Sequence, residues 1–431
     1  MTLLDGLVLS GFLATAFQWR GVLPIDIRLV YLVAVAVLCY TARLDGLRIH
    51  RQVAVFLLGA GATSLLGVAA GRTGAQSVAA QLAGIGVFST ALFAYFRLNH
   101  GQLLNKTGWF LSLMFYLSLF AVAQETAYLV HFRPLYDINY LLPGVGVGPI
   151  TREGPFLRVF SFFTEPGHFA IALTPAVYVA VNALFFSKRF FYTRFQAVTV
   201  VVALVLTFSA VGYVGLLLCL LVGAGRRRAL RAFLLLGAAG AAGFLLVLNF
   251  RGRLTTMFEL LARGDAVEGN VSSFNLFVNA QVALASFLGH WLWGSGLGSH
   301  FVSYNTYVAQ TGLPEGVMRF LSMMNPEDLN RDDAYSMLLR IPSELGLFGI
   351  LSVTYFFVSN RVTLNVEPYR MLSRMCIVFF LTYCVRDGHY FRFELWYFLA
   401  VYAYLEEAAR RAVSPALSRR ESAVVSLGSE P

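Results

Sequence analysis

The stretch RVFSFFTEPGHFA, residues 158–170, marks the place where a short polar loop enters a long apolar segment. Arg158, Glu165 and His168 fall within eleven consecutive positions there. Charged groups next to hydrocarbon are costly, and they are usually retained because a function needs them. We therefore expect a membrane boundary at this stretch, and we take all three residues as candidates for a functional site.

The composition of the chain is that of a membrane protein. Of its 431 residues, 58% are hydrophobic and only 13% are charged, and the mean hydropathy is +0.67. The apolar runs are long and lack the alternation of a membrane barrel, so the expected fold class is all-α, a polytopic helical membrane protein. The net charge of +10 could suggest nucleic acid as a partner. The basic residues instead form short clusters between apolar runs, which indicates membrane topology and no nucleic-acid role.

About twelve apolar runs are long enough to be transmembrane helices. They lie near residues 3–19, 27–42, 52–71, 77–96, 107–130, 164–187, 195–209, 211–225, 229–250, 341–359, 371–385 and 393–408. The two runs between 195 and 225 are separated at the sequence Phe208–Gly212, where a Ser/Gly turn is expected. The four cysteines all lie inside apolar runs, so neither disulfides nor a metal site is expected.

The distribution of basic residues predicts the orientation of the chain. With the N-terminus in the cytoplasm, every short loop on that side carries at least two cations, as the positive-inside rule requires. Residues 1–408 then form a single transmembrane domain with both termini cytoplasmic. Two outer loops are expected, at 131–163 and 251–340; the amphipathic stretch 274–285 could lie on the membrane surface or pack on the ends of the spans. Residues 409–431 are expected to be a disordered cytoplasmic tail.

The predicted outer face is rich in arginine, although the positive-inside rule should deplete it there. The arginines of its charged clusters are Arg158, Arg331, Arg340, Arg386 and Arg392. A guanidinium is always charged, and its planar fork of donors suits phosphate oxygens. We therefore favour a cavity that binds the diphosphate headgroup of an anionic lipid. Alternatively, single arginines pair with nearby acidic residues or touch the headgroups of membrane lipids.

Two residues of the opening stretch could act as a general base. Glu165 could accept a proton from a sugar hydroxyl, or it could simply precede a helix that begins at Pro166. His168 is the competing base, although a single histidine on a helix is more often a structural hydrogen-bond partner. Both alternatives stay open for each residue.

Two further charged clusters have the same design, a polar loop that leads into a span. The segment 331–349 places Asp332 and Asp333 before the span and Glu344 just after its start. The segment 386–392 contains His389 between two arginines. The glycine-rich sequence WGSGLG, residues 293–298, is interpreted as a backbone turn, because it lacks the strand and the lysine of a nucleotide-binding loop.

Four short motifs resemble the O-antigen polymerase and ligase superfamily. They are R-x6-E-P-G-x-F-A from Arg158, T-F-S-A-V-G from Thr207, W-G-x-G-x-G from Trp293 and E-L-G-L-x-G from Glu344. The resemblance runs from about Arg158 to Gly349. It implies a fold like that of GT-C-type glycosyltransferases, which work at the periplasmic face without metal or cofactor on an undecaprenyl-diphosphate-linked glycan.

The resemblance also implies roles for single residues. Arg158 would contact the donor diphosphate or the acceptor glycan, Glu165 would belong to the site, and Glu344 matches the later motif. That motif usually has a His or Asp followed by Asn, eleven positions before a glycine, whereas the position here is Tyr335. The base therefore stays open among Asp332, Asp333, Glu165 and His168.

The function expected from these observations is polymerisation of lipid-linked repeat units into a surface polysaccharide, such as O-antigen, capsule or exopolysaccharide, at the bacterial inner membrane. The chemistry needs arginines to stabilise the leaving diphosphate and one base for the incoming hydroxyl. A ligase that transfers finished polysaccharide to lipid A core is the first alternative. A flippase for lipid-linked oligosaccharide is the second, although transporters tend to place polar sites near the midplane of repeated halves. The glycine-rich segment 237–243 could pack against a chain-length regulator protein.

Overall fold

The computed structural model describes residues 2–15, 18–19, 27–141, 150–186, 190–224, 237, 271–310, 312, 329 and 331–427, and it is mostly helical. The first helices are α1 (Leu3–Ala14), α2 (Leu29–Asp45), α3 (Arg51–Ala69), α4 (Ala75–Asn99), α5 (Leu103–Leu129), α6 (Arg133–Tyr136) and α7 (Ile138–Leu141). They are followed by α8 (Pro166–Phe185), α9 (Arg194–Leu206), α10 (Ala210–Gly223), α12 (Val271–Gly289), α13 (His300–Tyr307), α15 (Met337–Ser359), α16 (Tyr369–Arg386) and α17 (Phe393–Leu427). Two short 3-10 helices are η1 (His100–Gln102) and η2 (Val308–Gln310).

The strands are short and make no layer of the fold. Strand β1 (Gln18–Trp19) pairs antiparallel with β2 (Ile27–Arg28), and Gln18 lies opposite Arg28. Strand β3 (Arg152–Glu153) pairs antiparallel with β4 (Phe156–Leu157) just before Arg158. The second hairpin thus fixes the backbone that leads into α8.

The predicted all-α membrane architecture is confirmed in its coarse form. Four helical segments are long and apolar enough to cross a membrane: Arg51–Ala69, Ala75–Leu129, Pro166–Phe185 and Met337–Ser359. Helices occupy every other predicted span that falls in the described residues, but several are short; α1, for example, ends at Ala14, whereas the predicted span extends to 19. The predicted span 229–250 lies outside the described residues, and the total of about twelve stays a prediction.

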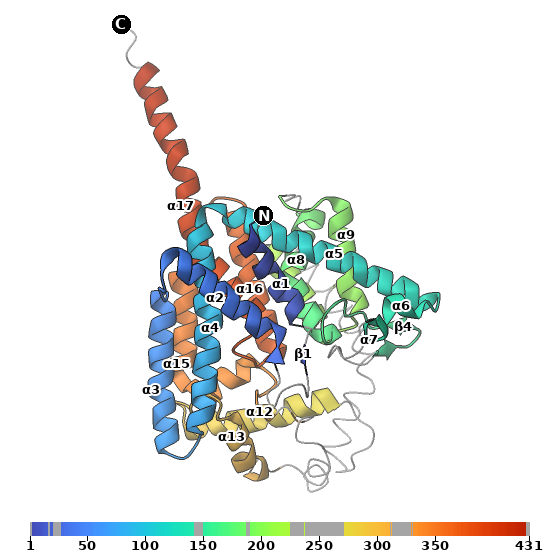
Figure 1. The fold of residues 1–431 in the computed structure, drawn as a ribbon, viewed down its shortest axis with the longest axis vertical. Coiled ribbons are helices and arrows are strands. Elements are labelled where there is room, and N and C mark those ends of the chain that lie inside the picture. The colour runs from blue at the N-terminus through green and yellow to red at the C-terminus, as the bar shows by residue number, and fades with distance from the viewer. Residues whose placement is uncertain are drawn as a thin grey trace.

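Helix α8 is at the centre of the fold. It packs against α9, α10 and α16, and most of its side chains are buried. Helices α3, α4 and α15 stand side by side at one flank, and α12 and α13 lie at the end of the molecule opposite the start of α1 and the far end of α17 (Figure 1). Helix α12 packs against α15 and α13, so the amphipathic stretch 274–285 contacts the end of a span.

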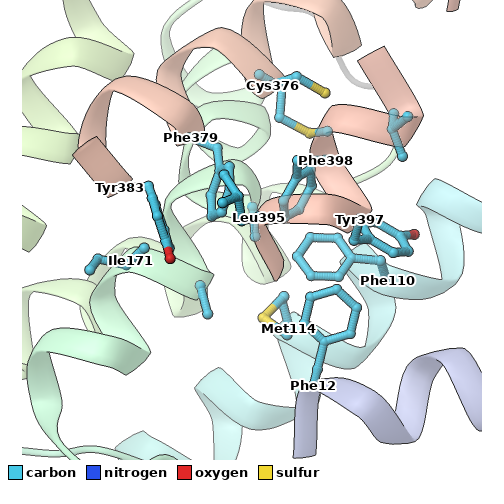
Figure 2. Close-up of a cluster of buried hydrophobic side chains, with 14 of the residues drawn as sticks. Phe12, Phe110, Met114, Ile171, Cys376, Phe379, Tyr383, Leu395, Tyr397 and Phe398 are labelled. Atoms are coloured by element: carbon cyan, nitrogen blue, oxygen red, sulfur yellow. The ribbon is translucent and has the colours of Figure 1, made fainter. Parts of the chain in front are cut away.

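An aromatic cluster ties the last two helices to the N-terminal half. Phe12 of α1 lies 4.9 Å from Phe110 of α5, measured between ring centroids, and Phe379 of α16 lies 4.4 Å from Phe398 of α17 (Figure 2). Tyr397 contacts both Phe12 and Phe110. Helices in a membrane associate largely through such close packing. The cluster therefore joins α16 and α17 to α1 and α5.

The predicted break in the run 195–225 is confirmed. Helix α9 ends at Leu206 and α10 begins at Ala210. Phe208 has a positive φ of 46°, which neither helix could contain. A Cβ on Gly212 would lie 3.1 Å from the Cβ of Ala170, so the break brings α10 close to the first turns of α8.

Helix α17 continues to Leu427, within the segment 409–431 that the sequence predicted as a disordered cytoplasmic tail. Pairs four residues apart stabilise this continuation: Glu406 binds Arg410 at 3.1 Å and Glu407 binds Arg411 at 2.6 Å. The last residues of the predicted tail, 428–431, lie outside the described residues.

Candidate functional site

The sequence around Glu165 starts a helix, as one of the two sequence interpretations proposed. Glu165 is the extended N-cap residue of α8 and Pro166 is the first helical residue. The Glu165 side chain, however, makes no capping hydrogen bond. It turns instead toward His168, one helical turn along, so that the carboxylate oxygen Oε1 lies 3.1 Å from His168 Nε2.

The loop between α16 and α17 is organised by Asp387. Its Oδ1 accepts hydrogen bonds from the backbone N–H of His389 at 2.9 Å and from the hydroxyl of Tyr383 at 3.2 Å. Its Oδ2 accepts a hydrogen bond from Arg392 Nε at 3.0 Å. Asp387 is only 5% exposed, so it acts as an internal anchor that points Arg392 toward α8.

The two elements meet at His168. Arg392 Nη2 lies 3.0 Å from His168 Nε2, across 224 positions of sequence, and Asp387 Oδ2 lies 3.9 Å from the same nitrogen. The other ring nitrogen, Nδ1, is 2.7 Å from Thr164 Oγ1. A guanidinium can only donate, so in neutral His168 the Nε2 atom is the acceptor and Nδ1–H donates to Thr164.

A third segment, ahead of α15, completes the group. Asp333 Oδ2 lies 3.1 Å from His389 Nε2, and the backbone N–H of Met337 donates to Asp387 O at 2.8 Å. A Cβ on Gly388 would lie 1.8 Å from the Asp333 carbonyl oxygen, so only glycine allows this approach. We call the group formed by Glu165, His168, Asp333, Asp387, His389 and Arg392 the His168 cluster.

Charges within the His168 cluster change the ionisation of its loop residues. Burial raises the pKa of Asp387, but the charges of Arg392, His389 and His168 outweigh it and hold that pKa well below its usual range. The nearby His168 also lowers the pKa of Glu165, with help from Arg386 and Arg392. Both carboxylates are therefore ionised at neutral pH and complement the arginines.

A cavity of about 20 Å³ opens beside His168. Its polar lining consists of Thr15, Thr164, His168, Tyr383, Asp387, Arg392 and Glu394. This volume has room for about one water molecule, so a larger substrate requires the surrounding segments to move apart. Arg392 also lines a second small cavity together with Arg28 and His389.

Glu394 belongs to this site, although the sequence analysis missed it. It lies in the first turn of α17, is 7% exposed, and lines the same cavity as His168 and Arg392. Its signal in the sequence is the one that identified Glu165, namely a carboxylate at the start of an apolar run.

Arg340 and Glu344, expected to bind substrate, are buried and bound to each other. Arg340 is 1% exposed and Glu344 0%, and Arg340 Nε lies 3.0 Å from Glu344 Oε1. Arg340 Nη1 also donates to the carbonyl oxygen of Gly388 at 2.8 Å, and its guanidinium lies 4.6 Å from the centre of the Tyr390 ring. The pair therefore supports the loop of the His168 cluster, and the expected contact of these two residues with substrate stays a prediction.

The glycine-rich sequence 293–298 is a backbone turn, as predicted, and it packs on a kink in α15. The backbone N–H groups of Ser295 and Gly296 donate to the carbonyl oxygens of Ser343 and Glu344 at 3.0 and 2.8 Å. Gly346, with φ 58° and ψ −147°, breaks the helix at this point. Two of the motifs that the sequence singled out thus form one structural unit.

The remaining predicted site residues make contacts outside the His168 cluster. The Arg386 guanidinium stacks 3.7 Å from the centre of the Tyr335 ring, and that of Arg331 lies 5.1 Å from the ring centre of Tyr304. Asp332 is exposed to solvent. Arg158 follows β4, where its backbone N–H donates to Thr151 O at 3.0 Å, and its charge reaches Tyr213 of α10.

Comparisons with known proteins add no relative. A scan against protein-family models, a search of curated proteins and a search of solved structures each found no match. Within the described ranges, no three His, Cys, Asp or Glu side chains are arranged to hold a metal ion. The chemistry of the site is therefore inferred from its own residues.

Proposed function

We propose that this chain is a glycosyltransferase of the bacterial inner membrane, similar in fold to GT-C enzymes, which polymerises undecaprenyl-diphosphate-linked repeat units into a surface polysaccharide. One observation carries the proposal: His168 and Glu165, from the E-P-G-H start of α8, meet Arg392 and Asp387 from the loop before α17. A base and a fixed cation thus lie side by side at the end of a membrane-spanning helix. Such a pair suits a donor that already carries a diphosphate leaving group.

His168 is the base that this arrangement favours. Arg392 stabilises the neutral ring, because its N–H points at Nε2. When Nε2 accepts the proton of the acceptor hydroxyl, Glu165 at 3.1 Å stabilises the resulting imidazolium. The hydroxyl oxygen then bonds to the anomeric carbon of the donor sugar, and the bond to the diphosphate breaks. Glu165 stays the alternative base, because its carboxylate lies within 3.1 Å of the same ring nitrogen.

The arginines suit the departure of the diphosphate from the donor sugar. Arg392 and Arg386 both act electrostatically on Glu165, so both lie where they can also attract a lipid diphosphate. Negative charge grows on the diphosphate as the sugar leaves, and a nearby guanidinium lowers the energy of that state. Arg158, which the resemblance assigns to the donor or acceptor, would complete the site when the segments around the 20 Å³ cavity open.

The first prediction tests this function by electrophoresis of surface polysaccharide. Deletion of the gene should leave a single repeat unit on the lipid core, whereas loss of a ligase would leave unattached lipid-linked polymer. Plasmid-borne Arg392→Ala and His168→Gln should fail to restore long chains, with a loss of roughly 10²-fold or more from the base alone. Arg410→Ala, on the exposed extension of α17, is the matched control and should restore them. Long chains from both site variants would contradict the proposal.

A further inference from the structure

A large apolar cavity lies between α3, α15 and α17, and one end of it reaches Met337 and Tyr390 beside the loop of the His168 cluster. Its volume is about 590 Å³, and its walls include Phe56 of α3, Ile341 and Phe356 of α15, Phe380 of α16 and Leu399 of α17. Sites for small molecules in proteins typically have volumes of roughly 300–1,000 Å³ and mostly apolar walls. The cavity therefore has the size and lining of a binding site, and the proposed reaction does not use it.

The shape of this cavity favours a long, flexible occupant. Its lining residues on α15 are Met337 and Ile341 before the kink at Gly346 and five residues between Ser352 and Phe357 after it, with Asn360 just past the end of the helix. The lining thus includes residues near both ends of α15, on either side of its kink. A hydrocarbon chain that follows the membrane depth fits such a space better than a compact ligand.

The polar groups of the cavity gather at one end, where α3 begins. Arg51 is the only residue with a fixed charge among the described residues that line the cavity, and His50 and Gln52 flank it. The His50 side chain does not cap α3, so the first N–H groups of the helix and the positive end of its dipole face the mouth. Gln52 also accepts a hydrogen bond from Asn360 at 2.8 Å, which joins the ends of α3 and α15 there.

We propose that this cavity holds one acyl chain of an anionic phospholipid, whose phosphate binds Arg51 and the N-terminus of α3. The cations at the two ends of the cavity determine which end holds the headgroup of the lipid. At the opposite end of the cavity, beside Met337 and Tyr390, the neighbouring cation is Arg340, which is 1% exposed and bound to Glu344. An anionic headgroup therefore gains most at Arg51, on the side of the membrane opposite the His168 cluster. The site is thus distinct from the one proposed for the lipid-linked donor.

Lipid retention by the full-length protein tests this site. The purified protein is incubated in mild detergent with vesicles of equal parts phosphatidylglycerol and phosphatidylethanolamine, repurified, and analysed by native mass spectrometry. The wild type should retain one phosphatidylglycerol per chain. Ser352→Trp, which fills the cavity, should abolish retention, whereas Thr354→Trp, exposed on the same helix and outside the cavity, should leave it unchanged.

Charge reversal provides a second, milder test in case the tryptophan disturbs folding. Arg51→Glu should lower the amount of retained phosphatidylglycerol roughly fivefold, the order expected for one basic residue at an anionic lipid. Arg48→Glu changes the net charge equally on an exposed side chain outside the cavity and should have no such effect. Equal retention of the two phospholipids, equal losses in test and control variants, or displacement of phosphatidylglycerol by a polyprenyl phosphate would each overturn the proposal.

Discussion

At the scale of the residue, the charged groups of this chain divide by their surroundings. His168 and Arg392 line a small cavity, and Glu165 contacts His168 beside it. Arg340 and Glu344 are also an arginine and a glutamate, but both side chains are buried and they bind each other. The proposed function therefore assigns substrate contacts to the first group and a structural role to the second.

Arg340→Ala should therefore act through stability. Removing one partner of a buried ion pair leaves the other charge uncompensated, at a cost of about 3–5 kcal/mol. It also removes the hydrogen bond from Arg340 to Gly388 that supports the loop before α17. We expect a strongly lowered midpoint of thermal unfolding in detergent and less protein in the membrane.

Arg158→Ala, at a half-buried loop position, should in contrast abolish polymer at an unchanged protein level. Equal membrane levels for the two variants would contradict the distinction.

His389 should make the folded state sensitive to acid. Burial and Arg392 lower its pKa below the usual 6.5, although Asp333 opposes them. Between that lowered pKa and 6.5 the unfolded chain binds more protons than the folded chain, so stability falls as the pH falls through this window. We expect a lower unfolding midpoint at pH 5 than at pH 8, and a smaller difference between the two in His389→Gln. The same difference in both proteins would show that His389 does not contribute.

At the scale of the element, the sequence predicted local features well, such as the starts and breaks of helices. It did not predict which of these features lie next to each other in the fold. The start of α8 at Pro166 and the break after Leu206 follow from proline, glycine and serine at defined positions. The contact between His168 and Arg392 joins residues 224 positions apart, and no local pattern encodes it. Glu394 escaped attention for a related reason, because only the fold shows that the start of α17 faces the start of α8.

Gly388 should be indispensable for bringing the loop before α15 against the loop before α17. A methyl group there would lie 1.8 Å from the Asp333 carbonyl oxygen, so one of the two backbones must shift. Overpacking of this kind costs typically about 1–3 kcal/mol, and here it would also separate Asp333 from His389. We expect Gly388→Ala to lose polymer and to lower the unfolding midpoint. Gly86→Ala, on α4 with nothing within 4 Å of the added Cβ, is the control that should behave like wild type.

At the scale of the whole molecule, composition alone predicted a helical membrane protein, because only helices or closed barrels satisfy the backbone in lipid. The number of spans was harder to predict. Short helices such as α9 and α10 have apolar sequences, but neither is long enough to qualify by itself as a membrane span. Their depth depends on packing against α8, which hydropathy does not report. The arrangement of charged loops, in contrast, makes a definite prediction about sidedness.

Both ends of the chain should face the cytoplasm, with the His168 cluster on the other side. In Figure 1, the extension of α17 and the start of α1 lie at one end of the molecule, opposite α12 and α13. The basic loops before α3 and α5 alternate with arginine-poor turns in the way that the positive-inside rule describes. Single-cysteine labelling of intact spheroplasts with a membrane-impermeant maleimide measures this directly, in a Cys39→Ser background because Cys39 is the exposed native cysteine among those described. Thr306→Cys, exposed on α13, should react, whereas Arg411→Cys on α17 should react only after lysis. The reverse pattern would put the His168 cluster in the cytoplasm, where the proposed lipid-linked donor would be on the wrong side of the membrane.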